Sequence, residues 1–288
     1  MAVKRRAQNI TLVCLPKALP RSKWVEAART ASTINPVNHP PIEMLARAMR
    51  GFSATPLRIA VMTTKYWGTK GVNLSVGFLD TPPAALKTRI LAHLNAWGKT
   101  ANVRFRQTSG TAQVRIARAG GTDGGYWSYL GTDILHIPLN QPTMNLEAFA
   151  METPESEFHR VVRHEAGHTL GFPHEHMRRA LVNLIDPNKA IKFFGATQGW
   201  SSQEVRQQVL TPIEESSLVG TTADPNSIMC YQIPGSITKS GKPIAGGLDI
   251  DASDFTFAGK IYPKTGATPP KALAPKRRAT RSKGRRRG

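Results

Sequence analysis

The chain has 288 residues, with 39 Lys and Arg against 19 Asp and Glu, so its formal net charge is +20. A chain of this length buries a full hydrophobic core in one or two domains, and an apolar content of 40% excludes a fully disordered protein. No stretch approaches the roughly 18 consecutive apolar residues that a membrane span requires, so we expect no integral membrane protein. The two cysteines, Cys14 and Cys230, exclude a disulfide-rich scaffold and leave one bridge or none.

Residues 1–55 are expected to be a lead-in or a pro-segment. The basic residues at 4–6 and the apolar run at 9–15 are typical of a signal peptide, but Asn9 and Thr11 interrupt the apolar run and Pro16 and Lys17 end it. We therefore predict no conventional signal peptide, and the location of the protein stays open. Apolar residues at helical spacing predict short helices at about 24–31 and 42–49.

Alternating apolar residues predict strands at 57–61, 72–78, 103–105 and 114–116, with a fifth short strand at 134–138. Thr81 followed by Pro82 predicts the start of a helix, whose buried stripe is formed by Leu86, Ile90, Leu94 and Trp97. Thr153 and Pro154 predict the start of a second helix that ends at Gly171. Shorter helices are expected at 186–194, 201–210 and 253–262, among loops rich in Gly and Pro. The pattern indicates a sheet with covering helices in the first half and an irregular second half.

The C-terminal end is strongly basic. From Lys271 to Gly288 there are nine basic residues and no acidic one, and without them the formal charge would be +11. We expect residues 264–288 to form a disordered tail. Two interpretations remain open for the tail at 271–288: a solvated extension, or an attachment to an anionic partner such as a nucleic acid or a membrane surface.

A histidine-rich run on the second long helix points to a metal centre. His164 and His168 are four residues apart, so a helix places both imidazoles on one face. A catalytic zinc ion takes three protein ligands and keeps a fourth position for water. Glu165 lies one step round the helix from the first imidazole, where its carboxylate can take a proton from that water.

The chain after this helix offers a third imidazole. Gly171 can adopt a positive φ, end the helix and turn the chain, so that His174 returns to the same point. Two alternatives remain open at this stage. The two helical histidines are a surface pair, or the site holds a structural zinc ion whose fourth position is closed.

The run at 164–175 resembles the motif H-E-x-x-H-x-x-G-F-x-H-E of the astacin branch of the metzincin metallopeptidases. Metzincins also have a Met-turn, which in astacins reads S-x-M-x-Y. This chain has the matching segment 55 residues after His174, as Ser227-Ile228-Met229-Cys230-Tyr231. The resemblance covers about residues 57–263 and neither end of the chain. It implies an α/β (α+β) zincin fold, with a twisted mixed five-stranded sheet, an active-site helix and an irregular C-terminal subdomain.

The resemblance also implies roles for individual residues. His164, His168 and His174 would bind one catalytic Zn²⁺, and Glu165 would act as general base and then pass the proton to the leaving amine. The catalytic domain would span residues 56–263, with an upper subdomain to about 171, a lower subdomain at 172–263 and the cleft between them. The segment at 124–131 is expected either to border this cleft as a substrate-pairing edge strand or to be a packed turn.

Three further residues belong to this implied site. Met229 would form an apolar floor under the metal ligands, a use that suits a soft and adaptable side chain. Tyr231 would steady the oxyanion of the tetrahedral intermediate. Glu175 would pair with the new N-terminus of a processed enzyme or with a water there, and an ordinary salt bridge is the alternative.

The cysteines depart from the astacin pattern and leave alternatives open. Cys230 stands where astacins commonly have His, and as a fourth metal ligand it would block the water position. Cys14 is either a buried or free cysteine, or a latency thiol that binds the zinc from the lead-in.

We therefore predict a monomeric zinc metalloendopeptidase that acts on protein or peptide substrates. The resemblance favours a secreted protein. The alternative from another class is a basic protein that binds nucleic acid or an anionic surface and keeps a structural or vestigial zinc site.

Overall fold

The computed structural model describes residues 14, 17–40, 63–121, 124–212, 223–230 and 232–264. The helix predicted at 42–49, the strand predicted at 57–61, Tyr231 and the basic residues at 271–288 lie outside this part of the chain. None of the helices in the described ranges has the length and apolar character needed to cross a membrane.

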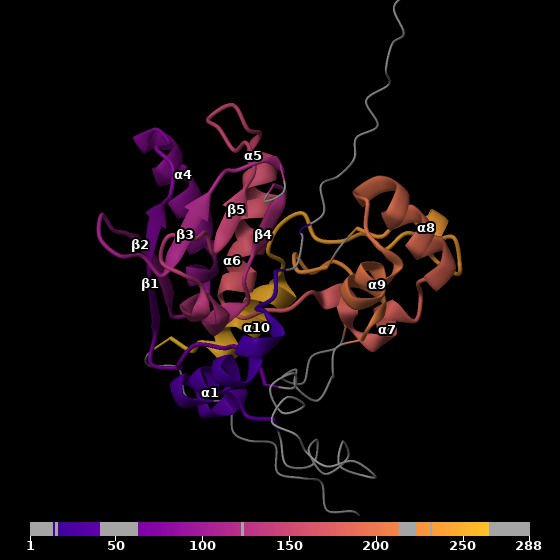
Figure 1. The fold of residues 1–288 in the computed structure, drawn as a ribbon, viewed down its shortest axis with the longest axis horizontal. Helices are drawn as coiled ribbons and strands as arrows, with labels where there is room; N and C mark the ends of the chain where they lie inside the picture. Colours follow the sequence, from indigo (N-terminus) through magenta and orange to yellow (C-terminus); the bar gives the residue numbers. More distant parts are fainter. Residues whose placement is uncertain are drawn as a thin grey trace, which may run out of the picture.

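A mixed five-stranded sheet forms the first half of the molecule (Figure 1). Its strands are β1 (Val72–Phe78), β2 (Val103–Gln107), β3 (Val114–Ala117), β4 (Tyr126–Ser128) and β5 (Met144–Leu146). They lie in the order β2-β1-β3-β5-β4, and all neighbours are parallel except β4, which runs antiparallel to β5. The predicted mixed sheet is confirmed, and β4 forms one of its edges.

The strand predicted at 134–138 is wrong. Residues Gly131–His136 form a 3₁₀ turn instead. Ile134 and Ile137 are buried while Leu135 is exposed. The two buried residues are three apart, which fits a helical turn and not the two-residue period of a strand.

Two helical segments cover one face of the sheet (Figure 1). The first is α4 (Ala84–Leu94), which continues into a 3₁₀ turn at Asn95–Lys99. The second runs from α5 (Glu155–Glu157) through a π-helical turn at Phe158–Val162 into α6 (Arg163–Thr169).

Both helices begin later than the sequence predicts. The N-cap residue of α4 is Pro83, because Pro82 precedes another proline and is pushed into the extended region. Pro154 caps the second helix without a side-chain hydrogen bond. The hydroxyl of Thr153 instead accepts the N–H of Ala150, at 3.0 Å.

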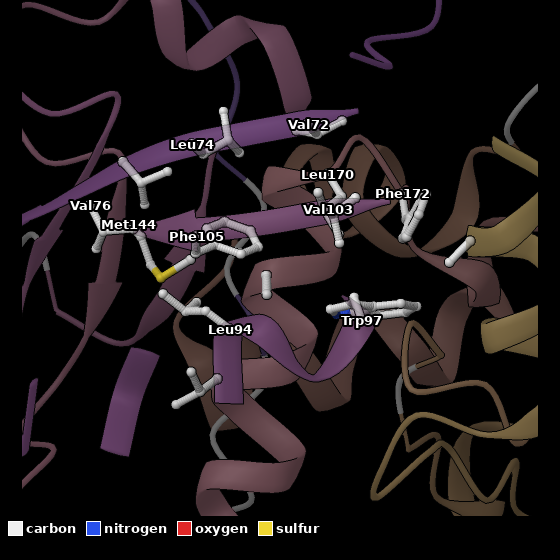
Figure 2. Close-up of a cluster of buried hydrophobic side chains, with 14 of the residues drawn as sticks. Val72, Leu74, Val76, Leu94, Trp97, Val103, Phe105, Met144, Leu170 and Phe172 are labelled. Carbon is white, nitrogen blue, oxygen red and sulfur yellow. The ribbon is translucent and has the colours of Figure 1, made fainter. Parts of the chain in front are cut away.

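The main core lies between the sheet and these helices (Figure 2). Val72, Leu74 and Val76 of β1 face Leu94 and Trp97, and the predicted stripe on α4 is fully buried. The indole N–H of Trp97 donates to the carbonyl of Arg163 at 2.8 Å. This bond ties the core directly to the first residue of α6.

The second half is built from short helices and loops, as predicted. It contains α7 (Arg179–Val182), α8 (Pro187–Gln198), α9 (Ser202–Val205) with a π-helical turn at Arg206–Leu210, and α10 (Ala252–Ile261). The capping box of Ser201 and Glu204 is confirmed. The last helix is capped by Asp251, two residues before the predicted start. A second core that includes Phe194, Cys14 and Cys230 lies in this half.

The lead-in packs against the sheet half. Helix α1 (Trp24–Ile34) confirms the first predicted helix and lies against the 3₁₀ turn at Gly131–His136. Asn38 is buried and joins the lead-in to the backbone of Tyr66. The Nδ2 of Asn38 donates to the carbonyl of Tyr66 at 2.8 Å, and the Oδ1 of Asn38 accepts the N–H of Tyr66 at 2.9 Å. Residue Lys17 forms a parallel bridge with Tyr129, just beyond the end of β4.

Candidate metal centre

Helix α6 places two imidazoles on one face. His164 and His168 are one turn apart and nearly fully buried. Their ring centroids lie 4.6 Å apart with the ring planes perpendicular. The helix ends because Gly171 takes a φ of +93°, a conformation that residues with a Cβ adopt only with strain.

The turn at Gly171 brings the third imidazole back to the first two. The Nε2 atom of His174 lies 3.3 Å from that of His164 and 2.9 Å from that of His168. All three predicted ligand side chains therefore meet at one point. This is the arrangement expected from two histidines on one helix face and a third after the turn.

Backbone carbonyls orient two of these rings. The Nδ1 atom of His164 lies 2.6 Å from the carbonyl of Ile228, and the Nδ1 of His168 lies 2.8 Å from that of Phe172. Each carbonyl fixes the proton on Nδ1 and leaves a lone pair on Nε2. Burial lowers the pKa of His164 to about 4 and holds the pKa of His168 and His174 well below the usual value.

The carboxylate of Glu165 lies beside this cluster and is completely buried. Its Oε2 accepts a hydrogen bond from the hydroxyl of Ser128 at 2.8 Å, and the Cys14 thiol also donates to the carboxylate. Burial is the main influence and raises its pKa from 4.5 to about 7, against the opposing effect of these hydrogen bonds. Its other oxygen, Oε1, accepts no hydrogen bond from any residue that the structure describes.

A sulfur atom completes the cluster. The Sγ of Cys14 and the ligating nitrogens of the three histidines all lie within 4.8 Å of one another. The sequence allowed two interpretations of Cys14, a latency thiol or a simple buried or free cysteine. In the structure its thiol lies next to the three histidines. Cys230 lies outside this group of four, in the second core, where burial raises its pKa to about 12.

The segment at 227–230 packs directly against α6. A Cβ added at Gly167 would come within 2.5 Å of the Sδ of Met229, so helix and turn are in close contact there. The carboxylate of Asp254 anchors the turn, because it accepts the hydroxyl of Ser227 at 2.6 Å and the N–H of Ile228 at 2.8 Å. Burial raises the pKa of Asp254 to about 6.

Glu175 is paired inside the fold. Its Oε1 lies 2.9 Å from the Nε of Arg178, whose side chain is only 6% exposed, and it also accepts the N–H of Asp224 at 3.0 Å. The N–H of Glu175 donates to the carbonyl of Met229 at 2.8 Å. In the full chain Glu175 therefore forms an ordinary salt bridge with Arg178, and its pairing in a processed enzyme stays a prediction.

The segment at 124–131 contains β4, and its outer edge faces the lead-in. The bridge between Lys17 and Tyr129 places the lead-in along this edge, three residues after the thiol at Cys14. The edge strand lies beside the metal centre through the contact of Ser128 with Glu165, and its pairing with substrate stays a prediction.

A second group of potential ligands joins α4 to the start of the helix that leads into α6, but its hydrogen bonds do not suit a metal. The Nε2 atoms of His93 and His159 lie 3.0 and 3.4 Å from Oε1 of Glu155. The Nε of Arg163 donates to Nδ1 of His93 at 3.2 Å, so the proton of His93 is on Nε2 and no lone pair is available there. Arg89 also binds Glu155, and the group is a hydrogen-bonded network.

Two residues of the site were missed in the sequence. Ser128 was considered only as part of the segment at 124–131, and Asp254 only as part of the helix expected at 253–262. Neither has a local sequence signal for its contact, because each partner is more than 25 residues away in the chain.

Comparisons with known proteins give a clear structural relationship. No family model matches the chain, and no curated protein sequence matches it. Two solved structures of myroilysin align at 30% identity. One has a TM-score of 0.65 and covers 69% of this chain and 96% of myroilysin, and the other has a TM-score of 0.54 and covers 69% and 86%. A hatching enzyme zinc-protease of the medaka fish Oryzias latipes aligns at 17% identity with a TM-score of 0.46, over 68% of this chain and 92% of that one, a likeness too distant to bear on function.

The fold is of the zincin type. A mixed five-stranded sheet packs on a helix that carries two converging histidines, and a third histidine follows after a glycine turn. Within that class, the chain belongs to the same family as myroilysin.

Proposed function

We propose that this protein is a zinc-dependent endopeptidase in a latent form. The observation that supports this most directly is the meeting of three imidazole Nε2 atoms next to a buried carboxylate. Membership in the myroilysin family and the zincin fold agree with a protease.

The residues present fit a zinc ion. Three neutral imidazoles with their lone pairs directed at one another repel unless a cation lies between them. Their low pKa values keep them neutral, which is the form that binds zinc. His164, His168 and His174 would hold the ion, and when bound it would polarise the peptide carbonyl and lower the pKa of water.

Glu165 would carry the proton transfers. As water attacks the carbonyl carbon, the carboxylate accepts a proton, and it then delivers this proton to the nitrogen when the carbon–nitrogen bond breaks. Burial disfavours the charge on this carboxylate and raises its pKa, which makes it a better base for the first step. Tyr231 would donate its phenol hydrogen bond to the oxyanion, and Met229 would support the ligands from below.

Cys14 would hold the enzyme latent. Its sulfur occupies the corner of the cluster that Glu165 also reaches, which is where the attacking water must bind. The thiol belongs to the lead-in, so residues 1–55 would be a pro-segment and residues 56–263 the catalytic domain. The rival interpretation is a permanent site of one sulfur and three nitrogens, which is the ligand set of a structural zinc ion.

One experiment separates these alternatives. The full chain and its Cys14→Ala variant are purified, their zinc content is measured, and each is incubated with an unstructured protein substrate. A latent enzyme gains hydrolysis in Cys14→Ala and keeps one zinc per chain. A structural site loses zinc in this variant and cleaves nothing, and that result would overturn the proposal.

Two controls complete the test. Adding Glu165→Gln to the Cys14→Ala chain should leave the zinc in place and lower turnover by about 10²- to 10⁴-fold, the usual contribution of general acid–base catalysis. Deleting residues 264–288 should leave hydrolysis unchanged, whereas a protein whose function is to bind an anionic partner would lose its ligand.

A further inference from the structure

Ser128 makes a direct contact with the carboxylate of Glu165. It is the last residue of β4 and is 3% exposed. Its Oγ lies 2.8 Å from Oε2 of Glu165 and 2.9 Å from the backbone carbonyl of the same residue. No other described residue except Cys14 makes a side-chain hydrogen bond to this carboxylate.

The sheet holds Ser128 firmly in place. It pairs with Met144 of β5 in the antiparallel register, and the next residue, Tyr129, donates its N–H to the carbonyl of Thr143 at 3.0 Å. Because successive side chains of a strand point to opposite faces, this register directs the Ser128 hydroxyl towards α6. The position of the hydroxyl is therefore set by the backbone of two strands.

The single hydroxyl proton has two acceptors within reach. The carbonyl of Glu165 lies inside α6, where a helical N–H is its ordinary partner. The carboxylate has no such partner, and a buried charged oxygen without a donor is costly. A hydrogen bond to an ionised group is also about twice as strong as one to a neutral group, so the proton is directed to Oε2.

We propose that Ser128 is a positioning residue for the general base: it binds Oε2 of Glu165, fixes the rotamer of the side chain and leaves Oε1 to exchange the proton with water. This inference rests on the proposed function. A carboxylate held by one oxygen keeps its orientation when the Cys14 thiol leaves.

The test compares kcat, KM and zinc content in the full chain carrying Cys14→Ala. Adding Ser128→Ala should lower kcat by about 10- to 100-fold, since small displacements of a catalytic group have effects of that size. KM and zinc content should stay within about two-fold, because no metal ligand is touched. Ser128→Thr keeps the hydroxyl and should restore most of kcat.

A matched control is Ser75→Ala, which removes another strand hydroxyl. Ser75 lies in β1, which two strands separate from β4, and it accepts the N–H of Gln113 at 2.9 Å. It should leave kcat unchanged. If Ser128→Ala does not fold, Ser128→Cys takes its place, because a thiol has nearly the same shape and is a weak donor.

The outcomes are distinct. If the Cys14→Ala parent does not hydrolyse protein, the proposed function fails. If the parent is active and Ser128→Ala has the same kcat, the positioning role is refuted. A fall in zinc content and thermal stability that Ser128→Thr does not reverse would identify a purely structural role and would also overturn the inference.

Discussion

Replacing Gly171 by alanine tests whether the turn after α6 builds the metal centre. Gly171 has a φ of +93°, and a Cβ there would lie 2.9 Å from the carbonyl oxygen of Lys65 and 3.1 Å from a ring carbon of Tyr66. The Lys65 carbonyl cannot move freely, because it accepts the N–H of Thr132 at 3.0 Å. The new methyl group would therefore clash with a backbone carbonyl that is held in place.

The expected cost follows from two contributions. A left-handed conformation costs a residue with a Cβ about 1–2 kcal/mol, and overpacking adds about 1–3 kcal/mol. The lower entropy of the unfolded alanine chain offsets roughly 0.4–1 kcal/mol. We expect a net loss of about 2–4 kcal/mol in the free energy of unfolding, measured by urea denaturation of the zinc-free protein.

Gly199 provides a matched control. It also ends a helix with a positive φ, of +69°, but nothing lies within 4 Å of a Cβ there. Gly199→Ala should therefore cost only the strain, about 1 kcal/mol or less after the offset. If Gly171→Ala loses no more stability than Gly199→Ala, the close contact with Lys65 does not constrain the turn.

The same substitution should weaken the metal centre. The carbonyl of Phe172, next in the chain, holds the ring of His168. Displacing such an outer partner of a metal ligand typically lowers affinity by about 10- to 100-fold. Zinc titration of Gly171→Ala should show this loss, and an unchanged affinity would refute the role of the turn.

Three further predictions follow from buried groups. Arg178→Ala should lower the free energy of unfolding by about 3–5 kcal/mol, because it leaves Glu175 buried without its cation, and the double variant with Glu175→Gln should recover part of this loss. Asp254 has a pKa raised from 3.8 to about 6, so the folded protein holds this proton more tightly than the unfolded chain and its contribution to stability is lost as pH rises from about 4 to about 6. The free energy of unfolding of the parent relative to Asp254→Asn, measured at several pH values, should fall by about 3 kcal/mol over that range, and a constant difference would contradict the reasoning. A chelator should lower the midpoint of thermal unfolding of the parent but not of His174→Ala, since bound metal stabilises only the folded state that binds it.

The sequence by itself determined the local features of this protein. The spacing of His164 and His168 and the glycine at 171 are local geometry, so they predicted two ligands on a helix and a third after a turn. The alternation of apolar residues in β1 predicted a strand for the same reason. The start of α4 and the conformation at 134–138 were predicted wrongly. Either of two successive prolines can precede a helix, and apolar residues at 134 and 137 fit both a short strand and a helical turn.

Tertiary structure decided what meets the site from distant parts of the chain. The Cys14 thiol and the Ser128 hydroxyl reach the centre through the packing of a lead-in and an edge strand. The burial that raises the pKa of Glu165 likewise depends on all of these neighbours together. Sequence spacing carries no information on such contacts, because their geometry is set only when the lead-in, the sheet and the helix α6 pack against one another.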